Sequence, residues 1–209
     1  MVVRQINTFI PDCSTVHTRT LEEFVDIALK RTFYCFSAIK TKYYRVDGKT
    51  IYNHLNSDHY CTFLYFLSNT IFSELNEENI AAKIFLLNKS LYGLDLFYKV
   101  KMPDVFLLVH PLGTVIGNAV YKNYTVFYQN VAIGSTAEGI YPQFGEKTLF
   151  YSKTSVLGAT TSGENVIFGA NSFVINSDIP GNSTVVGQHP KNTIIKNDGR
   201  IINDIFEIE

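Results

Sequence analysis

Apolar positions in residues 1 to about 100 recur at the spacing of helices. Thr20 and Glu23 have the spacing of a capping box, and the apolar residues that follow fall three and four positions apart. Asp58 is placed to cap a second helix, and the Glu-Glu pair at 77–78 suits the positive end of a third. Between the first two, the Asp-Gly pair at 47–48 predicts the turn of a small hairpin. We therefore expect this half to be helical.

From about Val105 the apolar positions follow a different rule, a period of six. In sixes counted from residue 144, the first position is bulky and apolar in five of six cases. These first positions are Phe144, Phe150, Val156, Ser162, Phe168 and Val174, and Tyr121, Phe127 and Ile133 keep the same period upstream. The register breaks over residues 134–143, which we expect to leave the repeat as a loop.

A period of six has a geometric explanation. A three-sided coil needs one inward apolar residue on each side and a tight corner between sides, where Gly and Asn tolerate left-handed backbone angles. Successive coils then stack by parallel strand pairing. The alternative is a β-sandwich, but its turns would be spaced irregularly, about 8–12 residues apart. Residues 105–188 therefore predict a β-helix of four to five coils.

Composition and charge narrow the class of protein. The chain has 209 residues, 46% of them hydrophobic, and a net charge of −1, so no bulk field favours nucleic acid or anionic lipid. No apolar stretch approaches the ~20 residues of a membrane span, and the start lacks the apolar segment of a signal peptide. Cys13, Cys35 and Cys61 are odd in number and lack zinc-module spacing, which favours a reducing compartment and no metal. We expect a soluble, cytoplasmic protein.

His110 is the residue of the second half whose chemistry stands out. It ends the apolar stretch VFLLV and precedes Pro111. Histidine can act as a base near neutral pH, and the proline favours extended geometry for the residue before it. No cysteine is near His110 in the sequence. We therefore expect a reaction at His110 to proceed directly, without a covalent intermediate on a thiol. The alternative is a strand-end histidine that only donates to a backbone carbonyl.

Three segments resemble the hexapeptide-repeat acyltransferases, and among them the serine acetyltransferase-like group. They are HPLGTVIG, FYQNVAIGS and FGANSFVINSDIPGNSTVVGQHPK. The resemblance spans approximately residues 105–195 and implies an α+β fold, with an N-terminal α-helical domain followed by a left-handed parallel β-helix. It implies boundaries at 1–100 for the helical domain, 101–196 for the β-helix and 197–209 for a C-terminal tail.

The resemblance also implies an activity, the transfer of an acetyl group from acetyl-CoA. His110 falls where the family keeps its general base, and Asp104 is the nearest candidate in sequence to orient it. Contacts with acetyl-CoA are implied at Gly134, Ser135, Ser152, Ala170 and Lys191. A backbone N–H of Gly134 or Ser135 is the expected partner of the oxyanion. Members of the family assemble as trimers with the active site between subunits, so a homotrimer is expected.

The acceptor is where the chain departs from the serine-specific pattern. Val109 replaces an acid before the histidine, and Ile140, Tyr141 and Pro142 replace an Arg-His-Pro triplet. The pattern looks closer to acetyltransferases of sugar and polysaccharide pathways, so we expect O-acetylation of a sugar or glycan hydroxyl. Tyr128, Gln129 and Tyr141 are the candidate acceptor contacts. The alternatives are a serine or amino-sugar acetyltransferase of the same fold, or a non-catalytic scaffold.

Overall fold

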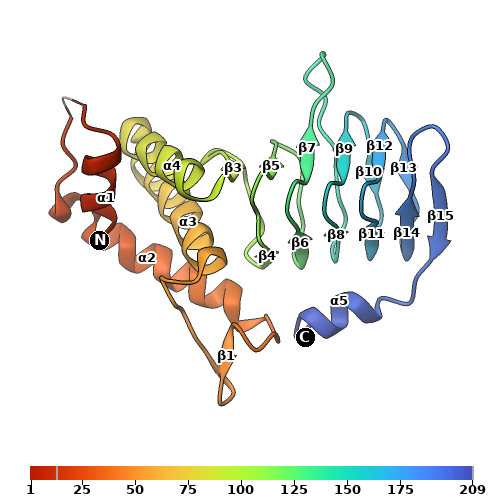
Figure 1. The fold of residues 1–209 in the computed structure, drawn as a ribbon, viewed down its shortest axis with the longest axis horizontal. Helices are drawn as coiled ribbons and strands as arrows, with labels where there is room; N and C mark the ends of the chain where they lie inside the picture. Colours follow the sequence, from red (N-terminus) through yellow and green to blue (C-terminus); the bar gives the residue numbers. More distant parts are fainter. Residues whose placement is uncertain (13, 209) are drawn as a thin grey trace.

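The computed structural model describes residues 1–12 and 14–208, so Cys13 and Glu209 lie outside the described residues. The helices of the first half gather at one end of the molecule and the short strands of the second half stack at the other (Figure 1). The helices are α1 (Val2–Phe9), α2 (Thr18–Ser37), α3 (Ser57–Leu75), α4 (Glu78–Tyr92) and α5 (Arg200–Ile205). The predicted α+β class, a helical region followed by a parallel β-helix, is confirmed.

Two helix starts differ from the sequence-based prediction. Helix α2 begins at Thr18 with His17 as its N-cap residue, before the predicted capping box. Helix α3 is capped by Asn56, whose side-chain oxygen accepts hydrogen bonds from the backbone N–H groups of Asp58 and His59. Asp58 therefore lies inside the first turn and is not the cap. Its carboxylate can contact another part of the chain.

The small hairpin is confirmed. Strand β1 (Arg45–Val46) pairs antiparallel with β2 (Lys49–Thr50), which leaves a two-residue loop between them. Both loop residues have positive φ angles, 50° at Asp47 and 73° at Gly48. A tight turn of this type matches the right-handed twist of its two strands, which explains the preference for Asp-Gly.

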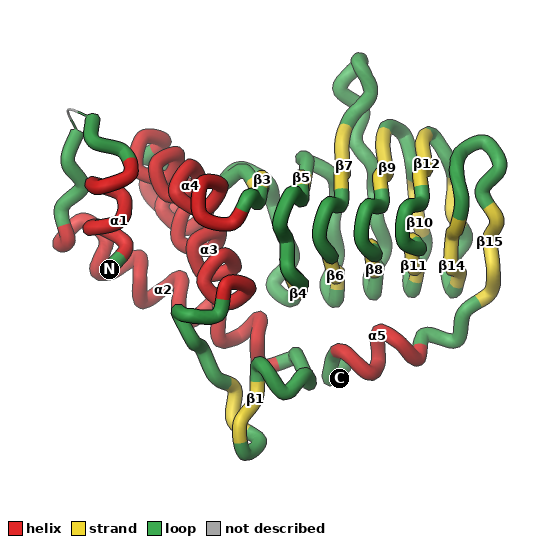
Figure 2. The backbone as a smooth tube through the Cα atoms, in the orientation of Figure 1, coloured by secondary structure: helices red, strands yellow, loops and turns green. Residues whose placement is uncertain are grey.

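The β-helix has three parallel sheets, and successive coils are visible side by side in Figure 2. One sheet contains β3 (Asp95–Leu96), β5 (Val115–Ile116), β7 (Ala132–Gly134), β9 (Ser155–Leu157) and β12 (Phe173–Ile175). The second contains β4 (Phe106–Leu108), β6 (Thr125–Phe127), β8 (Leu149–Phe150), β11 (Val166–Phe168), β14 (Ser183–Val186) and an antiparallel β15 (Thr193–Lys196). The third pairs β10 (Thr161–Ser162) with β13 (Asp178–Ile179), and single bridges through Val120 and Gln143 extend it.

The inside of the prism is filled by the residues that the period of six selected. Phe127, Phe150 and Phe168 are fully buried, and their rings stack on successive coils. The ring centroids are 5.1 Å apart for the first pair and 5.0 Å for the second, with nearly parallel planes. Ser162, the one polar first position, is only partly buried. The stack explains why the repeat favours Phe at this register.

The corners use the left-handed backbone that the Gly and Asn content predicted. Asn130, Asn165, Asn171 and Asn182 all have φ between 54° and 59°. Buried threonines next to the corners donate their hydroxyls to backbone carbonyls, as Thr148 does to Gly145 at 2.9 Å. These hydroxyls are thus satisfied within the protein, which allows adjacent coils to pack closely.

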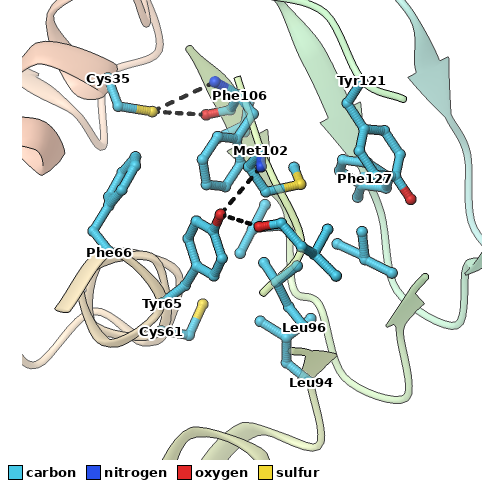
Figure 3. Close-up of a cluster of buried hydrophobic side chains, with 14 of the residues drawn as sticks. Cys35, Cys61, Tyr65, Phe66, Leu94, Leu96, Met102, Phe106, Tyr121 and Phe127 are labelled. Carbon is cyan, nitrogen blue, oxygen red and sulfur yellow. Dashed lines mark hydrogen bonds between the residues drawn. The ribbon is translucent and has the colours of Figure 1, made fainter. Parts of the chain in front are cut away.

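The helical half and the first coil share one continuous hydrophobic core. The Tyr65 hydroxyl on α3 donates to the carbonyl of Val100 at 2.7 Å and accepts from the N–H of Met102 at 3.1 Å (Figure 3). Cys35 on α2 contacts the backbone of Phe106 in β4 through its sulfur (Figure 3). Because this core is continuous, the division into domains near residue 100 remains a proposal.

The helices and the buried cysteines bear on two other classes of protein, membrane proteins and thiol-dependent enzymes. Among the described residues, no helix combines the length and the apolar character needed to cross a bilayer. Cys35 and Cys61 are buried free thiols, and burial raises the pKa of Cys35 to about 12. A thiol with so high a pKa is a poor nucleophile at neutral pH.

The predicted loop leaves the β-helix between β7 and β8. Residues 135–148 link these two strands, whereas only residues 117–124 link β5 to β6 on the coil before. The longer link accommodates the loop, which projects beyond the ends of the strands in Figure 1. Ile140 near its tip is exposed.

Candidate active site

His110 lies in a corner that is longer than the corresponding corner of the next coil. Residues 109–114 form the turn between β4 and β5, whereas residues 128–131 suffice for the turn between β6 and β7. His110 has a φ of 48°, and its side chain is 78% exposed. The expected extended geometry before Pro111 is wrong, because His110 adopts a left-handed backbone at this corner.

A carboxylate from the helical half holds this corner. Asp58 Oδ2 accepts a hydrogen bond from the backbone N–H of His110 at 3.2 Å and lies 3.7 Å from its Nδ1. The Asp58 side chain is only 14% exposed, and the first turn of α3 favours a negative charge. The hydrogen bond offsets part of the cost of a left-handed backbone at a non-glycine residue. Asp58 thus fixes both the turn and the side on which the ring lies.

The sequence-based prediction gave the orienting role to Asp104, and the structure puts Asp58 beside His110 instead. Asp104 is exposed and lies with Lys30, Arg31 and Tyr34 in a separate depression on the helical half. Its negative charge favours the protonated form of Arg31, although burial is the larger effect and lowers the pKa of that group. From the sequence, Asp58 is predicted only to cap a helix. It is far from His110 along the chain, and tertiary packing brings the two residues together.

The N-cap residue of α3 supports this arrangement, and its loss should be measurable. Replacement of Asn56 by alanine removes the acceptor for two backbone N–H groups, and we expect it to lower the free energy of unfolding by about 1 kcal/mol. Asn56→Ser is the matched control, since serine can cap the helix and should stay close to wild type. Urea unfolding followed by circular dichroism measures both. Equal stability of Asn56→Ala and wild type would contradict the assigned cap.

A cavity of about 490 Å³ opens beside His110. Three parts of the chain form most of its walls: the segment before the hairpin, the start of α3, and β4 with its corner. The lining residues are Thr41, Tyr43, Tyr44, Leu55, Asn56, Ser57, Asp58, Leu107, Leu108, Val109, His110, Tyr128 and Ile205. A volume of this size lies within the range of small-molecule sites.

The C-terminal segment supplies a further wall of the cavity. After the last coil the chain returns toward the helical half, so α5 lies below the strands in Figure 1. Lys40 donates its backbone N–H to the carbonyl of Ile205 at 2.8 Å, and Glu207 donates to that of Ala38 at 2.8 Å. Phe206 is fully buried. These bonds fix Ile205 at the cavity, so the predicted tail is an ordered part of this site.

Several of the predicted site residues lie along the same corner of the prism as His110. Tyr128 lines the cavity, and its ring centroid lies 5.2 Å from that of Tyr151 on the next coil. Gln129 and Ser152 occupy the corner on successive coils, since their carbonyls accept from the backbone N–H groups of Lys153 and Asn171 at 3.1 and 3.0 Å. Ala170 follows on the coil after that. The column extends along the prism away from His110.

Other predicted residues lie elsewhere in the subunit. Gly134 ends β7, so it and Ser135 are at the far end of that strand from the His110 corner. Tyr141 packs over Gly117, where an added Cβ would come within 2.9 Å of its ring. Lys191 is exposed in the turn that closes the last coil. A single subunit does not bring these four residues into the His110 cavity.

Sequence reasoning missed Tyr44 and Ile205 as residues of this cavity. Tyr44 follows α2 and Ile205 lies near the end of the chain, so neither belongs to the repeat that drew attention. The signal that was available is a cluster of aromatic residues between two helices, at Tyr43 and Tyr44. Alone it predicts packing and not a site.

Comparison with known proteins finds similarity to serine acetyltransferases in sequence and in fold. No family model matches the chain. The chain is 40% identical over 103 residues to the serine acetyltransferase of Staphylococcus xylosus, covering 47% of this chain and 46% of that protein. The crystal structure of serine acetyltransferase from Vibrio cholerae O1 biovar El Tor N16961 is similar with a TM-score of 0.72 and 17% identity, covering 94% of this chain and 77% of that one. A serine acetyltransferase in complex with CoA gives a TM-score of 0.70 and 17% identity, covering 93% and 82%.

The sequence similarity and the structural similarity cover different parts of the chain and support different conclusions. The chain spans about half the length of the curated relatives it matches. The structural similarity, at 17% identity, shows a shared fold of helices and β-helix. The similar proteins are serine acetyltransferases, and the comparisons give no support to the closer resemblance to sugar and polysaccharide acetyltransferases that the sequence suggested.

Proposed function

We propose that the protein is an acetyl-CoA-dependent O-acetyltransferase of the serine acetyltransferase kind. The observation that carries this proposal is the pair formed by His110 and Asp58 at the opening of a cavity of suitable size. The sequence similarity to serine acetyltransferases supports acetyl-CoA as the donor, and it favours serine over a sugar as the first acceptor to test.

The geometry supports a general-base role for His110. Nδ1 is the ring nitrogen near Asp58, so Nε2 is available to take the proton of an acceptor hydroxyl. The carboxylate stabilises the imidazolium that forms when the proton is transferred. The hydroxyl oxygen then attacks the thioester carbonyl, and the thiol of CoA leaves with a proton returned by the imidazolium. The buried thiols of Cys35 and Cys61 belong to the helical half, which favours direct transfer.

The corner column below His110 is the proposed path of the pantetheine arm. Gln129, Ser152 and Ala170 succeed one another along it, one coil apart. Gly134, Ser135 and Lys191 remain proposed contacts of acetyl-CoA. Because they lie outside the cavity of their own subunit, they would act on CoA bound at a neighbouring one. This arrangement requires an oligomer.

A homotrimer built through the β-helix would provide that arrangement. Large apolar side chains are exposed on the early coils and the projecting loop: Leu112 is 66% exposed, Val120 47% and Ile140 48%. Contact between subunits would remove these side chains from water, which is favourable for apolar surface. The proposed trimer is consistent with this surface.

Two measurements test the proposed function. We expect CoA at 100 times its dissociation constant to stabilise the folded protein by about 2.7 kcal/mol, seen as a higher melting temperature. We also expect release of free CoA from acetyl-CoA when a hydroxyl acceptor such as serine is added, followed with a thiol reagent. Desulfo-CoA should stabilise the protein without releasing thiol. A protein that neither gains stability with CoA nor releases it would be a scaffold, and the proposal would be rejected.

A further inference from the structure

The β-helix ends in a strand whose outer edge is free. Strand β15 pairs antiparallel with β14 and is the last member of its six-stranded sheet. After β15 the chain turns back toward α5, so this strand stands at the outer end of the row of strands in Figure 1. Within the described chain, no other strand pairs with its second edge. Such an edge is open to a strand from another molecule.

The backbone of β15 presents every second residue to this free edge. Asn197, directly after the strand, donates its N–H to the carbonyl of Asn182 at 2.9 Å, so its backbone faces β14. Because backbone groups alternate in direction along a strand, residues 193 and 195 also face β14, whereas Ile194 and Lys196 face away. Among residues 1–12 and 14–208, nothing bonds to the N–H and C=O groups of these two residues. They are available to an incoming strand.

The inward column of the prism ends at this strand. The register pairs Phe168 with Val185 and Val185 with Ile194, so Ile194 continues the column of stacked rings. Phe168 and Val185 are fully buried, whereas Ile194 is 46% exposed. Repeat proteins in solution need a terminal unit with a polar outer face to shield the core. Here the column ends in an isoleucine, so the core is left partly open to water at this end.

The column on the outer face of the same sheet ends in the same way. The register pairs Ile167 with Thr184 and Thr184 with Ile195. Ile167 is buried, whereas Ile195 is 51% exposed. Strand β15 therefore exposes an isoleucine on each of its two faces, and Lys196 is the charged residue among its four. Free edges are commonly protected by several charges, by proline or by a bulge, so an edge with this composition favours association.

We propose that two copies of this chain associate end to end through β15, which pairs antiparallel with β15 of the second copy in a register centred on Ile194. This association does not depend on the proposed function. A two-fold axis through the centre sets Ile194 opposite Ile194 of the second copy, and Thr193 opposite Ile195. These are cross-strand pairs of β-branched residues, which stabilise a sheet. The inward columns of the two prisms then form one continuous core, and both partly open ends are removed from water.

The register follows from the residues that face the free edge. In an antiparallel pair, a residue that faces the partner strand lies opposite another that does so. A register shifted toward the C-terminus would set Ile194 opposite Lys196, and one shifted toward the N-terminus would set it opposite Asn192. The register centred on Ile194 pairs apolar with apolar and sets Lys196 opposite Asn192. The two Lys196 side chains then lie about 14 Å apart along the strands, at ~3.4 Å per residue, which exceeds the screening length of about 8 Å.

The first experiment measures the mass of the assembly by analytical ultracentrifugation. Because a contact of a few residues is weak, the protein is measured from about 1 to 100 μM. Ile194→Lys sets two like charges opposite each other, and we expect it to halve the mass at the highest concentration, whatever number of copies assembles through the sides of the β-helix. Val46→Lys, at an exposed valine of the hairpin, is the matched control and should keep the wild-type mass. Equal masses of wild type and Ile194→Lys at every concentration would overturn the inference.

The second experiment tests the register by charge complementation. Ile194→Asp and Ile194→Lys should each have half the wild-type mass, because like charges meet at the centre of the pairing. An equimolar mixture of the two variants should recover the wild-type mass, since the substituted side chains then attract each other across the two-fold axis. High salt should weaken the mixed assembly and leave the wild-type assembly intact, because only the former depends on charge. Recovery of the mass by the mixture also shows that each variant is folded. A mixture that stays at half the mass overturns the inference.

Discussion

Acetyl transfer falls by about 10²–10⁴ when His110 is replaced by alanine, if His110 is the general base of the reaction. The imidazole takes the proton of the acceptor hydroxyl, and among the described residues no second imidazole lines the cavity. The measurement is kcat/KM for thiol release from acetyl-CoA with serine as the acceptor. Affinity for CoA should change little, because CoA does not depend on the base for binding.

The His110 variant should fold normally, which makes the kinetic result easy to interpret. The side chain is largely exposed, so little packing is lost. The hydrogen bond to Asp58 is made by the backbone N–H and survives in alanine. His54→Ala, at an exposed histidine on the helical half, is the matched control and should keep full activity. Near-native transfer by His110→Ala would remove the catalytic assignment.

Replacement of Phe150 by alanine has the largest expected effect on stability, a loss of about 3–5 kcal/mol. Phe150 is fully buried between Phe127 and Phe168, and its ring centroid lies 4.8 Å from that of Phe144. The side chains around it belong to stacked coils that cannot collapse into the space it leaves. Chemical denaturation followed by tyrosine fluorescence and circular dichroism measures the change.

A substitution on the surface distinguishes the loss of core packing from the mere removal of an apolar side chain. Leu86 on α4 is 46% exposed, and Leu86→Ala should alter the free energy of unfolding by less than about 0.5 kcal/mol. A loss below about 1 kcal/mol in Phe150→Ala would mean that the aromatic stack is not the core of the prism. Because coils stack on their neighbours, a large loss should be accompanied by a less cooperative transition.

The site and the relatives point to different details of the acceptor. The similar proteins are serine acetyltransferases, whereas the described lining of the cavity offers no lysine or arginine to the carboxylate of serine. Val109 and Tyr141 suggested from sequence that a zwitterionic amino acid would be poorly held.

Most of the β-helix could be predicted because its rule is local. One inward residue in every six and a left-handed corner between sides are written directly in the sequence, as at Phe150 and Asn171. The hairpin at residues 47–48 followed from two adjacent residues for the same reason. The start of α3 was not decided in this way, since Asn56 and Asp58 are both good caps and only the backbone selects between them.

The sequence by itself determined the repeat, its inward apolar positions and the place of His110 directly after an apolar strand. Only the tertiary structure decided which carboxylate meets that histidine, which tyrosine borders its cavity, and that the C-terminal helix forms a wall of it. The physical reason is distance along the chain. A β-helix repeats short-range rules, whereas this cavity joins α3, β4 and α5, whose contacts are set by the packing of the helical half and by the return of the C-terminal segment.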